Sequence, residues 1–211
     1  LSAKPTGRVE NADRLAAEGV DLLFQPGPDE VYPPGFTTTV HVEGLGDILE
    51  GEHRPGFFTG VATVVTKLLL QSLPDVAVFG EKDYQQVLVI RRLARDLDIP
   101  VRIEGAPIVR ESDGLAMSSR NAYLNADERA IATALFGTIS QIAENVGRGA
   151  APVEQADWGA DQLLRAGFAT VDYLTVRDAE TLVAVDDASR PARVLAAAKL
   201  GQTRLIDNVA V

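Results

Sequence analysis

The chain has 211 residues, of which 46% are hydrophobic and 24% are charged. This composition supplies enough apolar side chains for a globular core and too few charges for a disordered chain. Twenty Lys and Arg against 30 Asp and Glu give a formal net charge of −10, which argues against an extended footprint on a nucleic-acid backbone. We therefore expect a folded protein that does not bind nucleic acid.

The cysteine and histidine content narrows the kinds of site that the chain can build. It has no cysteine, which excludes disulfides, a thiolate zinc site and a Cys nucleophile. The two histidines, His41 and His53, are not spaced as metal ligands. The longest apolar stretch, from Val61 to Leu70, is interrupted by two threonines and a lysine, and the first residues contain no apolar signal segment. We expect a cytoplasmic protein without a membrane segment or a protein-built metal site.

Helix and strand patterns alternate in the first part of the chain. In order they predict a helix over 10–19, a strand over 21–24, an irregular segment over 25–54 with a short strand at 37–42, a helix capped by Thr59 and ended by Pro74, a strand over 76–79, a helix over 84–97 and a strand over 100–104. Such βαβ units require a parallel sheet with helices on its faces. We predict an α/β fold with a partial, doubly wound, Rossmann-like parallel sheet.

The pattern changes after residue 121 toward a small α+β domain. It predicts a helix that begins with an Asn125–Glu128 capping box, a helix from Pro152 to about Gly167, and strands over 171–176, 193–200 and 203–211. Gly201-Gln202 between the last two strands suits a type II′ hairpin turn. We therefore expect two domains, residues 1–116 with the parallel sheet and residues 117–211 as an α+β lid.

The first candidate site is Gly80-Glu81-Lys82-Asp83, directly after the strand over 76–79. Ligands of open parallel sheets bind beyond the carboxyl ends of the strands. Gly80 would let the backbone approach a ligand closely, and Lys82 would meet a phosphate. The same four residues also fit an ordinary turn with a solvated lysine.

The second candidate site is the loop from Gly114 to Asn121, at the junction of the two predicted domains. The hydroxyls of Ser118 and Ser119 and the guanidinium of Arg120 can chelate phosphate oxygens, although a plain turn also fits this sequence. Neither serine has a nearby histidine to act as a base, and no P-loop or dinucleotide-binding glycine motif occurs. The two candidate sites together predict a triphosphate held from two sides.

A longer series of motifs adds a family resemblance to this interpretation. In chain order the motifs are Leu49-Glu50-Gly51, Arg54-Pro55-Gly56, Gly60-Val61, Pro74-Asp75, Phe79-Gly80-Glu81-Lys82-Asp83-Tyr84-Gln85-Gln86, Arg110, Asp113-Gly114-Leu115-Ala116-Met117-Ser118-Ser119-Arg120-Asn121, Tyr123-Leu124 and Arg204-Leu205-Ile206-Asp207-Asn208. From about Gly19 to its C-terminus the chain resembles the pantothenate synthetases, which belong to the nucleotidyltransferase superfamily.

The resemblance implies an enzyme that uses ATP and Mg²⁺ to join pantoate to β-alanine through a pantoyl adenylate, and that works as a homodimer. It implies catalytic roles for Lys82, Ser118, Ser119 and Arg120 and a pantoate contact for Gln86. The ATP contacts that it implies are Gly80, Glu81, Lys82, Asp83, the backbones of Val109 and Met117, and Ser118, Ser119 and Arg120.

The sequence also departs from the family pattern. Phe57 stands where the family usually has His, and Lys4-Pro5-Thr6 replaces a Tyr-Pro-Arg stretch. The family's N-terminal strand, its Pro-Thr-Met-Gly turn, its two-histidine motif and its Asn-Pro-x-Gln-Phe segment have no counterpart. We expect a truncated pantothenate synthetase with an uncovered edge or face of its parallel sheet. The alternatives are a non-catalytic remnant that serves as a dimerisation module, and another adenylate-forming nucleotidyltransferase.

Overall fold

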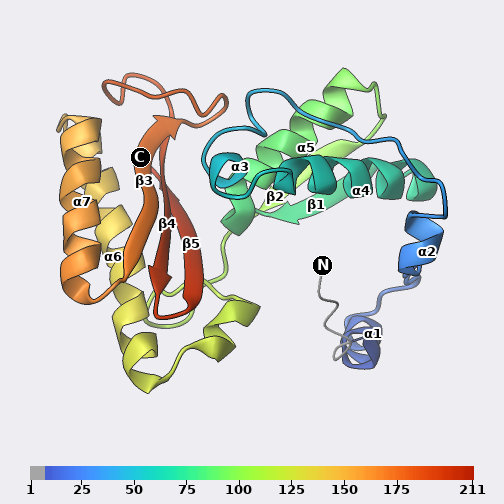
Figure 1. Ribbon diagram of the computed structural model, residues 1–211, viewed down its shortest axis with the longest axis horizontal. Helices are drawn as coiled ribbons and strands as arrows, with labels where there is room; N and C mark the ends of the chain where they lie inside the picture. The colour runs from blue at the N-terminus through green and yellow to red at the C-terminus, as the bar shows by residue number, and fades with distance from the viewer. Residues whose placement is uncertain (1–7) are drawn as a thin grey trace. The chain divides into compact units, whose positions relative to one another are not determined.

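Figure 1 shows a computed structural model that describes residues 8–211 and divides between residues 38 and 39 into two units. The first unit contains α1 (Arg8–Ala17) and α2 (Pro28–Val31). The helix predicted over 10–19 is therefore confirmed, and Gly19 follows it with a φ of 76°. The strand predicted over 21–24 was wrong: residue 21 is a bend, residues 22–24 have no regular secondary structure, and no described residue pairs with them in a ladder.

The second unit begins with the helices and parallel strands predicted for the first half. Its elements there are α3 (Glu50–His53), α4 (Phe57–Ser72), β1 (Val76–Gly80), η1 (Glu81–Asp83), α5 (Tyr84–Asp96) and β2 (Arg102–Ala106). β1 and β2 pair in parallel from Val76 opposite Arg102 to Gly80 opposite Ala106. The predicted α/β fold with a small parallel sheet is confirmed.

Two local predictions in this region were wrong. α4 starts at Phe57 rather than after Thr59, because Gly56 adopts a left-handed φ of 77° and serves as the N-cap. The strand predicted over 37–42 does not form, because the Val40 N–H donates to the hydroxyl of Thr63 at 2.9 Å rather than to a neighbouring strand.

The second half forms an antiparallel sheet covered by helices, as predicted. Its elements are η2 (Ser119–Tyr123), α6 (Ala126–Gly147), α7 (Pro152–Ala166), β3 (Thr170–Asp178), β4 (Ala192–Leu200) and β5 (Thr203–Ala210), with strand order β3-β4-β5. The capping box is present, since Asn125 accepts from the Glu128 N–H and Glu128 accepts from the Asn125 N–H. Gly201 has a positive φ of 55° and Gln202 does not, as a type II′ turn requires.

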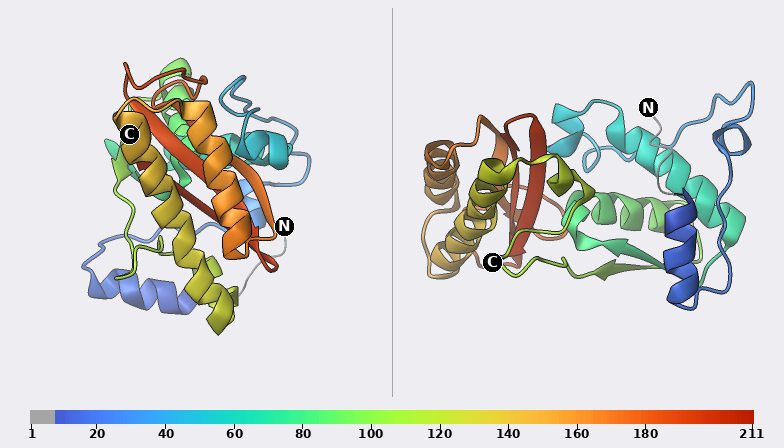
Figure 2. Two further views of the ribbon diagram at one scale, coloured as in Figure 1. Left: turned by 90° about the vertical axis from the view of Figure 1, so that its left-hand side faces the viewer. Right: turned by 90° about the horizontal axis from the view of Figure 1, so that it is seen from below.

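Three hydrophobic clusters hold these elements together. α6 and α7 lie on one face of the antiparallel sheet (Figure 2, left) around fully buried residues such as Leu135 and Ile139. A second cluster joins α4 and α5 to one face of the parallel pair. A third cluster, with Leu49, Tyr84 and Leu195 at its centre, joins the other face of the antiparallel sheet to α5. The third cluster therefore places the start of α5 against β4.

Other surfaces of the described chain are less covered. Val78 of β1 is 63% exposed, so the face of the parallel pair opposite α4 and α5 is open at this position. Within residues 8–211, no helix has the length and apolar character needed to cross a membrane.

A glycine substitution tests the packing of α3 against the preceding loop. A Cβ at Gly51 would overlap the carbonyl oxygen of Gly46, which is backbone and cannot rotate away. We expect Gly51→Ala to lower the free energy of unfolding by about 1–3 kcal/mol, measured by urea denaturation. Gly60→Ala is the matched control, because Gly60 is exposed in α4 and its Cβ would have no described neighbour within 4 Å. The control should be stabilising by up to about 1 kcal/mol, and equal effects at both positions would contradict the packing.

Candidate active site

Lys82 lies just beyond the carboxyl end of β1, where the sequence placed the first candidate site. β1 ends at Gly80, η1 carries Lys82, and α5 begins at Tyr84. A Cβ at Gly80 would have no described atom within 4 Å, so the backbone faces open space there. The edge of the parallel sheet therefore leaves room for a ligand beside Lys82.

Three neighbouring clefts follow β5 and share basic side chains. Cleft A is lined by Glu50, Phe57, Phe58, Lys82, Asp83, Tyr84, Gln85, Gln86, Tyr173, Leu195, Ala196, Ile206, Asp207 and Asn208. Cleft B is lined by Lys82, Leu115, Ala116, Ser118, Asn121, Leu135, Arg204, Leu205, Ile206 and Asp207. Cleft C is lined by Arg120, Tyr123, Glu128, Gln202, Thr203 and Arg204. Lys82 belongs to A and B, and Arg204 to B and C, so neighbouring clefts share a lining residue, and together they make up the candidate surface.

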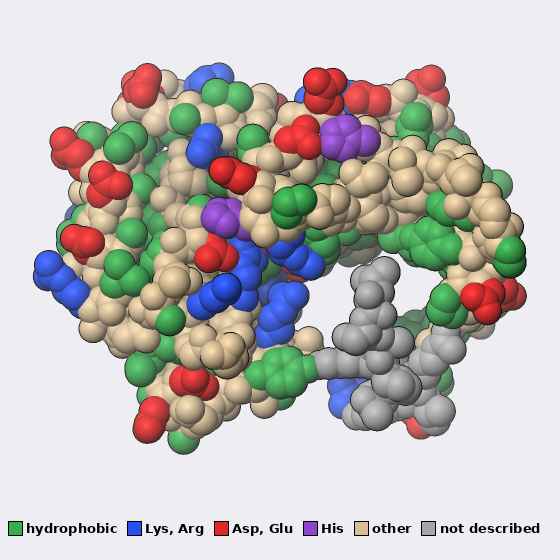
Figure 3. Space-filling model, in the orientation of Figure 1, with side chains coloured by type: hydrophobic (Ala, Val, Ile, Leu, Met, Phe, Trp, Pro, Cys, Tyr) green, Lys and Arg blue, Asp and Glu red, His purple; other side chains and the backbone are tan. Residues whose placement is uncertain are grey.

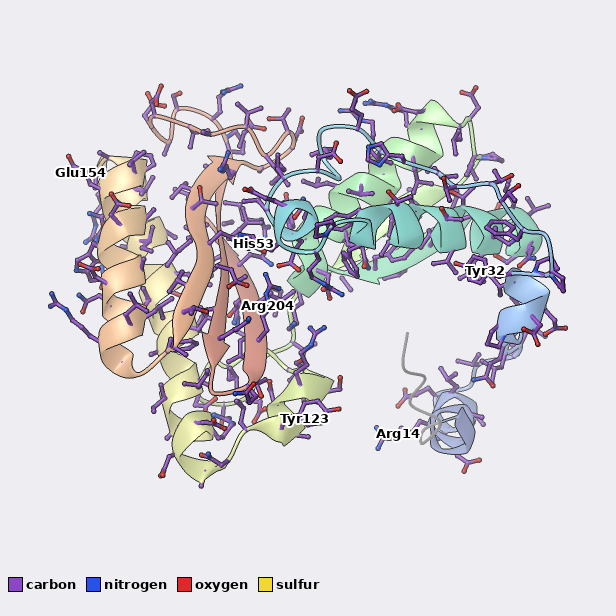
Figure 4. All side chains as sticks on the ribbon, in the orientation of Figure 1. Arg14, Tyr32, His53, Tyr123, Glu154 and Arg204 are labelled. Atoms are coloured by element: carbon purple, nitrogen blue, oxygen red, sulfur yellow. The ribbon has the colours of Figure 1, made fainter. Side chains whose placement is uncertain are left out.

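Charges of both signs line this surface: Lys82, Arg120 and Arg204 are the positive ones, and Glu50, Asp83, Glu128 and Asp207 are the negative ones. Figure 3 shows Lys and Arg side chains gathered beside β5, where Figure 4 labels Arg204. Burial lowers the pKa of Lys82; Asp83 opposes this effect and the Arg120 guanidinium adds to it. A bound phosphate would stabilise the charged form of this partly buried ammonium, because its negative charge offsets those of the ammonium and the neighbouring guanidinium.

The second candidate site contributes to clefts B and C. Ser118 lines cleft B and caps η2, where its Oγ accepts from the Arg120 N–H at 3.2 Å. Arg120 lines cleft C, and Ser119 is exposed at the start of η2. The Asn121 side chain donates to the Ala116 carbonyl at 3.1 Å and braces the loop from inside. The structure therefore brings Lys82, Ser118 and Arg120 to one surface.

Five of the expected ATP contacts lie outside the three clefts, namely Gly80, Glu81, Val109, Met117 and Ser119. The Glu81 side chain packs over Gly105 of β2, and its carboxylate is 3.9 Å from Arg193. Val109 and Met117 are 66% and 55% exposed, and the Met117 N–H donates to the Val109 carbonyl at 2.9 Å. That amide is thus already engaged.

The two adjacent glutamines of α5 have different environments. Gln86 lines cleft A and is half-buried, whereas Gln85 is buried and fully hydrogen-bonded. The Gln85 amide donates to the carbonyls of Leu45 and Ile48 at 2.8 and 2.7 Å, and its oxygen accepts from the Glu50 N–H. Gln85 therefore holds the 45–50 loop against α5, while Gln86 is available to a ligand.

A buried ionic network next to cleft A was not predicted from the sequence. Arg204 of β5 contacts the carboxylates of Glu50 and Asp172 at 2.6 Å each. The Tyr173 hydroxyl donates to Glu50 at 2.9 Å, and burial together with this carboxylate raises the pKa of Tyr173. Arg204 leaves β5 on the side that faces α3 (Figure 4). The network thereby fixes α3 against the antiparallel sheet.

Phe57, the position that departs from the family pattern, does line cleft A. The Arg54 guanidinium stacks 3.6 Å from the centre of its ring. His53 is exposed, with its ring 5.9 Å from that of Tyr173, and Pro55 separates it from α4. His41 contacts Thr59 at 3.1 Å and Asp47 at 3.3 Å. Neither histidine lines cleft A, B or C.

The residues described here do not build a metal site of their own. No group of three or more His, Asp or Glu side chains in residues 8–211 is arranged to hold a metal ion. Mg²⁺ commonly binds through substrate phosphates, one or two carboxylates and water. A Mg²⁺ ion bound at this surface would therefore take most of its ligands from phosphate oxygens and water.

An open α/β unit with a cleft beyond the carboxyl end of a parallel strand is typical of enzymes that bind their ligand there. The profile of the pantoate-beta-alanine ligase family matches residues 3–210, and the chain belongs to this family of ATP-dependent ligases. The predicted membership and activity class are thereby confirmed.

Individual relatives agree with the family profile. The chain is 58% identical over 201 residues to the pantothenate synthetase of Paramagnetospirillum magneticum, covering 95% of this chain and 71% of the relative. It is 51% identical over 212 residues to that of Rhodospirillum rubrum, covering 100% and 75%.

Solved structures show the same fold. The pantothenate synthetase of Thermus thermophilus matches with a TM-score of 0.88 at 47% identity, covering 95% of this chain and 74% of that one. The Francisella tularensis pantoate-beta-alanine ligase, complexed with beta-gamma ATP and beta-alanine, matches with a TM-score of 0.78 at 30% identity, covering 97% and 70%.

Proposed function

We propose that this chain binds ATP and pantoate on the surface formed by clefts A and B, forms pantoyl adenylate there, and transfers the pantoyl group to β-alanine. The observation that carries the proposal is the position of Lys82, which lines both clefts at the carboxyl end of β1. A single cation at that point can contact the reacting groups of two substrates bound side by side. ATP and β-alanine are also the ligands of the related Francisella ligase.

The first step is adenylyl transfer. A pantoate carboxylate oxygen attacks the α-phosphorus of ATP, a new phosphorus–oxygen bond forms, and the bond to the bridging oxygen breaks. Pyrophosphate leaves with that electron pair. Negative charge develops on the phosphate oxygens, and the ammonium of Lys82 and the guanidinium of Arg120 stabilise it. The hydroxyls of Ser118 and Ser119 donate to phosphate oxygens, while Gly80 and Asp83 hold the ribose.

The second step is aminolysis of the adenylate. The neutral amine of β-alanine attacks the pantoyl carbonyl carbon, the amide bond forms, and AMP leaves with the carboxylate-derived oxygen. The proton lost from the amine passes to solvent. Gln86, half-buried in cleft A, hydrogen-bonds pantoate and keeps its carboxylate directed toward Lys82.

The remaining contacts and the assembly complete the proposal. Val109 and Met117 lie at the adenine, through backbone groups other than the already bonded Met117 amide. Mg²⁺ enters with ATP, is held mainly by phosphate oxygens and neutralises part of their charge. The enzyme works in the cytoplasm and as a homodimer; the homodimer is implied by the resemblance to the family, and sedimentation equilibrium measures it directly.

Pantoate-dependent exchange of labelled pyrophosphate into ATP tests this function. The first step is reversible, so the chain should exchange label when ATP, Mg²⁺ and pantoate are present, without β-alanine. Omitting pantoate should abolish exchange. Exchange that does not depend on pantoate would refute adenylate formation by this chain. So would the complete absence of exchange when the protein is folded.

The lowered pKa of Lys82 predicts a pH dependence. Lys82 stabilises phosphate charge only while protonated, so kcat/KM for ATP should fall as the pH rises through its pKa. Because burial lowers that pKa, the midpoint should lie below the ordinary lysine value of 10.5. The residual activity of Lys82→Arg should lack this alkaline limb, because a guanidinium does not deprotonate in this range. If Lys82→Arg kept the same fall in activity at high pH, that fall would come from the titration of another group.

The substitution at Phe57 predicts a gain of function. Phe57 lines cleft A but cannot donate a hydrogen bond, whereas exposed His53 lies outside the three clefts. We expect Phe57→His to raise the pantoate-dependent exchange rate several-fold, and His53→Ala to change it less than about twofold. A neutral Phe57→His together with a damaging His53→Ala would make His53 the functional residue.

A further inference from the structure

Asn208, near the end of β5, contacts the backbone of the turn that carries Lys82. Its side-chain amide donates to the carbonyl oxygens of Glu81 and Lys82, at 2.9 and 3.1 Å. Asn208 is 3% exposed, so these hydrogen bonds form away from water. A residue 126 positions away in sequence therefore fixes the backbone of Lys82 itself.

The turn needs such a partner because it has little internal support. η1 is a single turn of three residues, and its N-cap is Gly80, which has no side chain that could cap the turn. Carbonyl groups at the end of so short a helix require hydrogen-bond donors from elsewhere. The Asn208 amide donates to two consecutive carbonyls, which fixes the orientation of η1 as well as its position.

Asn208 is itself held in one orientation. Arg193 donates from Nη1 to the Asn208 Oδ1, which determines which end of the amide faces η1. The Arg193 guanidinium also stacks 3.9 Å from the centre of the Tyr84 ring, at the start of α5. The Asn208 N–H donates to the Asp207 carboxylate at 2.8 Å, and Arg110 donates to the same carboxylate. Every polar group of the Asn208 side chain is thus engaged.

We propose that Asn208, oriented by Arg193, is a positioning residue that holds the Lys82 backbone so that the ammonium group lies at the junction of clefts A and B. This inference rests on the proposed function of Lys82. Asn208 lines cleft A, but its amide hydrogens and oxygen are already bonded to Glu81, Lys82 and Arg193, so it acts through Lys82. A displacement of about 1 Å at a charge-stabilising group lowers a rate by about a hundredfold, so the loss of this clamp should be costly.

The test is a double-mutant cycle between positions 208 and 82. Asn208→Asp keeps the size of the side chain and its contact with Arg193, but it replaces the donating amide with an oxygen that faces two carbonyl oxygens. We expect about a 30- to 100-fold lower kcat for pantoate-dependent exchange, with KM for ATP and pantoate within about threefold. In a Lys82→Ala background the same substitution should lower the rate less than about threefold further.

Asn145→Asp is the matched control. The Asn145 amide donates to Gln155 at 2.7 Å in a half-buried position of α6, outside the three clefts. It should change kcat less than about twofold in either background. An equal loss from Asn208→Asp with and without Lys82 would show a general structural role and overturn the inference. An unchanged kcat in the Asn208→Asp single variant would also overturn the inference.

A second variant keeps the test decisive if Asn208→Asp does not fold. Arg193→Lys retains the positive charge but loses the fork that orients the Asn208 amide. It should give a smaller loss of kcat with the same dependence on Lys82, and an equal loss in both backgrounds would overturn the inference.

A readout that does not need activity separates this inference from the proposed function. Competitive acetylation of Lys82 over a pH range measures its pKa in the unliganded chain. Asn208→Ala, which adds no charge, should release η1 and expose Lys82 to water. The pKa of Lys82 should then rise toward the ordinary lysine value. The control Asn145→Asp should leave the pKa of Lys82 unchanged. If the unsubstituted chain shows no exchange, the proposed function fails, and the acetylation result still decides the role of Asn208. An unchanged pKa in folded Asn208→Ala would overturn it.

Discussion

Replacing Lys82 with alanine is expected to lower pantoate-dependent ATP–pyrophosphate exchange by about a hundredfold to a thousandfold. The ammonium stabilises charge that develops on the phosphates, and the loss of such a group raises the barrier by about 3–4 kcal/mol. The loss should appear mainly in kcat, because the interaction strengthens in the transition state. Exchange rates at saturating ATP and pantoate measure the effect.

The control for Lys82→Ala is a lysine outside the clefts. Lys199 is exposed on β4, and Lys199→Ala should leave both the exchange rate and the stability nearly unchanged. Lys82→Ala should also unfold at close to the original urea concentration. A loss of less than tenfold at Lys82 would make it the solvated turn lysine that its local sequence also allows.

Replacing Arg110 with alanine is expected to have the largest effect on stability. Arg110 makes two hydrogen bonds to the Asp207 carboxylate, at 2.7 and 2.9 Å, and Asp207 is 3% exposed. The Arg110 guanidinium also stacks 3.9 Å from the centre of the Phe136 ring. Without Arg110 a buried carboxylate has lost its counter-ion, which costs about 3–5 kcal/mol. Urea denaturation at pH 7 measures this loss.

An exposed arginine provides the comparison. Arg102 pairs with Glu104 at 2.8 Å, but both side chains are exposed. Arg102→Ala should therefore change the free energy of unfolding by less than about 1 kcal/mol. If Arg110→Ala and Arg102→Ala both changed the free energy of unfolding by less than about 1 kcal/mol, the buried Arg110–Asp207 pair would not stabilise the end of β5.

The local signals in the sequence predicted most of the elements. The Asn125–Glu128 capping box, the Pro152 start of α7 and the glycine of the last hairpin all act within a few residues, so the sequence alone reveals them. The start of α4 was placed three residues late, because Thr59 is a common N-cap and the left-handed conformation of Gly56 is not evident from sequence.

The strands that failed depend on distant partners. Residues 21–24 and 37–42 have strand-like composition, but a strand forms only where another chain segment accepts its hydrogen bonds. Val40 instead donates to a threonine side chain. Short apolar runs carry no information about such partners, so local patterns overpredict strands.

The candidate site was predicted in part for the same reason. Lys82, Gln86 and Ser118 belong to continuous motifs, and the structure brings them to one surface. The supports of this surface come from positions far apart, such as Glu50 with Arg204 and Lys82 with Asn208. No periodicity links residues so far apart in the chain, although the Arg204-to-Asn208 motif marked the segment that supplies both partners.

The fate of a labelled pantoate oxygen tests the central claim most directly. With ¹⁸O in both carboxylate positions, attack on the α-phosphorus places one labelled oxygen in the new acyl–phosphate (mixed anhydride) bond. Aminolysis by β-alanine then leaves that oxygen on AMP. Mass spectrometry of the products should show one ¹⁸O in AMP, one in pantothenate and none in pyrophosphate. Label in inorganic phosphate with ADP as the other product, or AMP without label, would contradict adenylate formation on this surface.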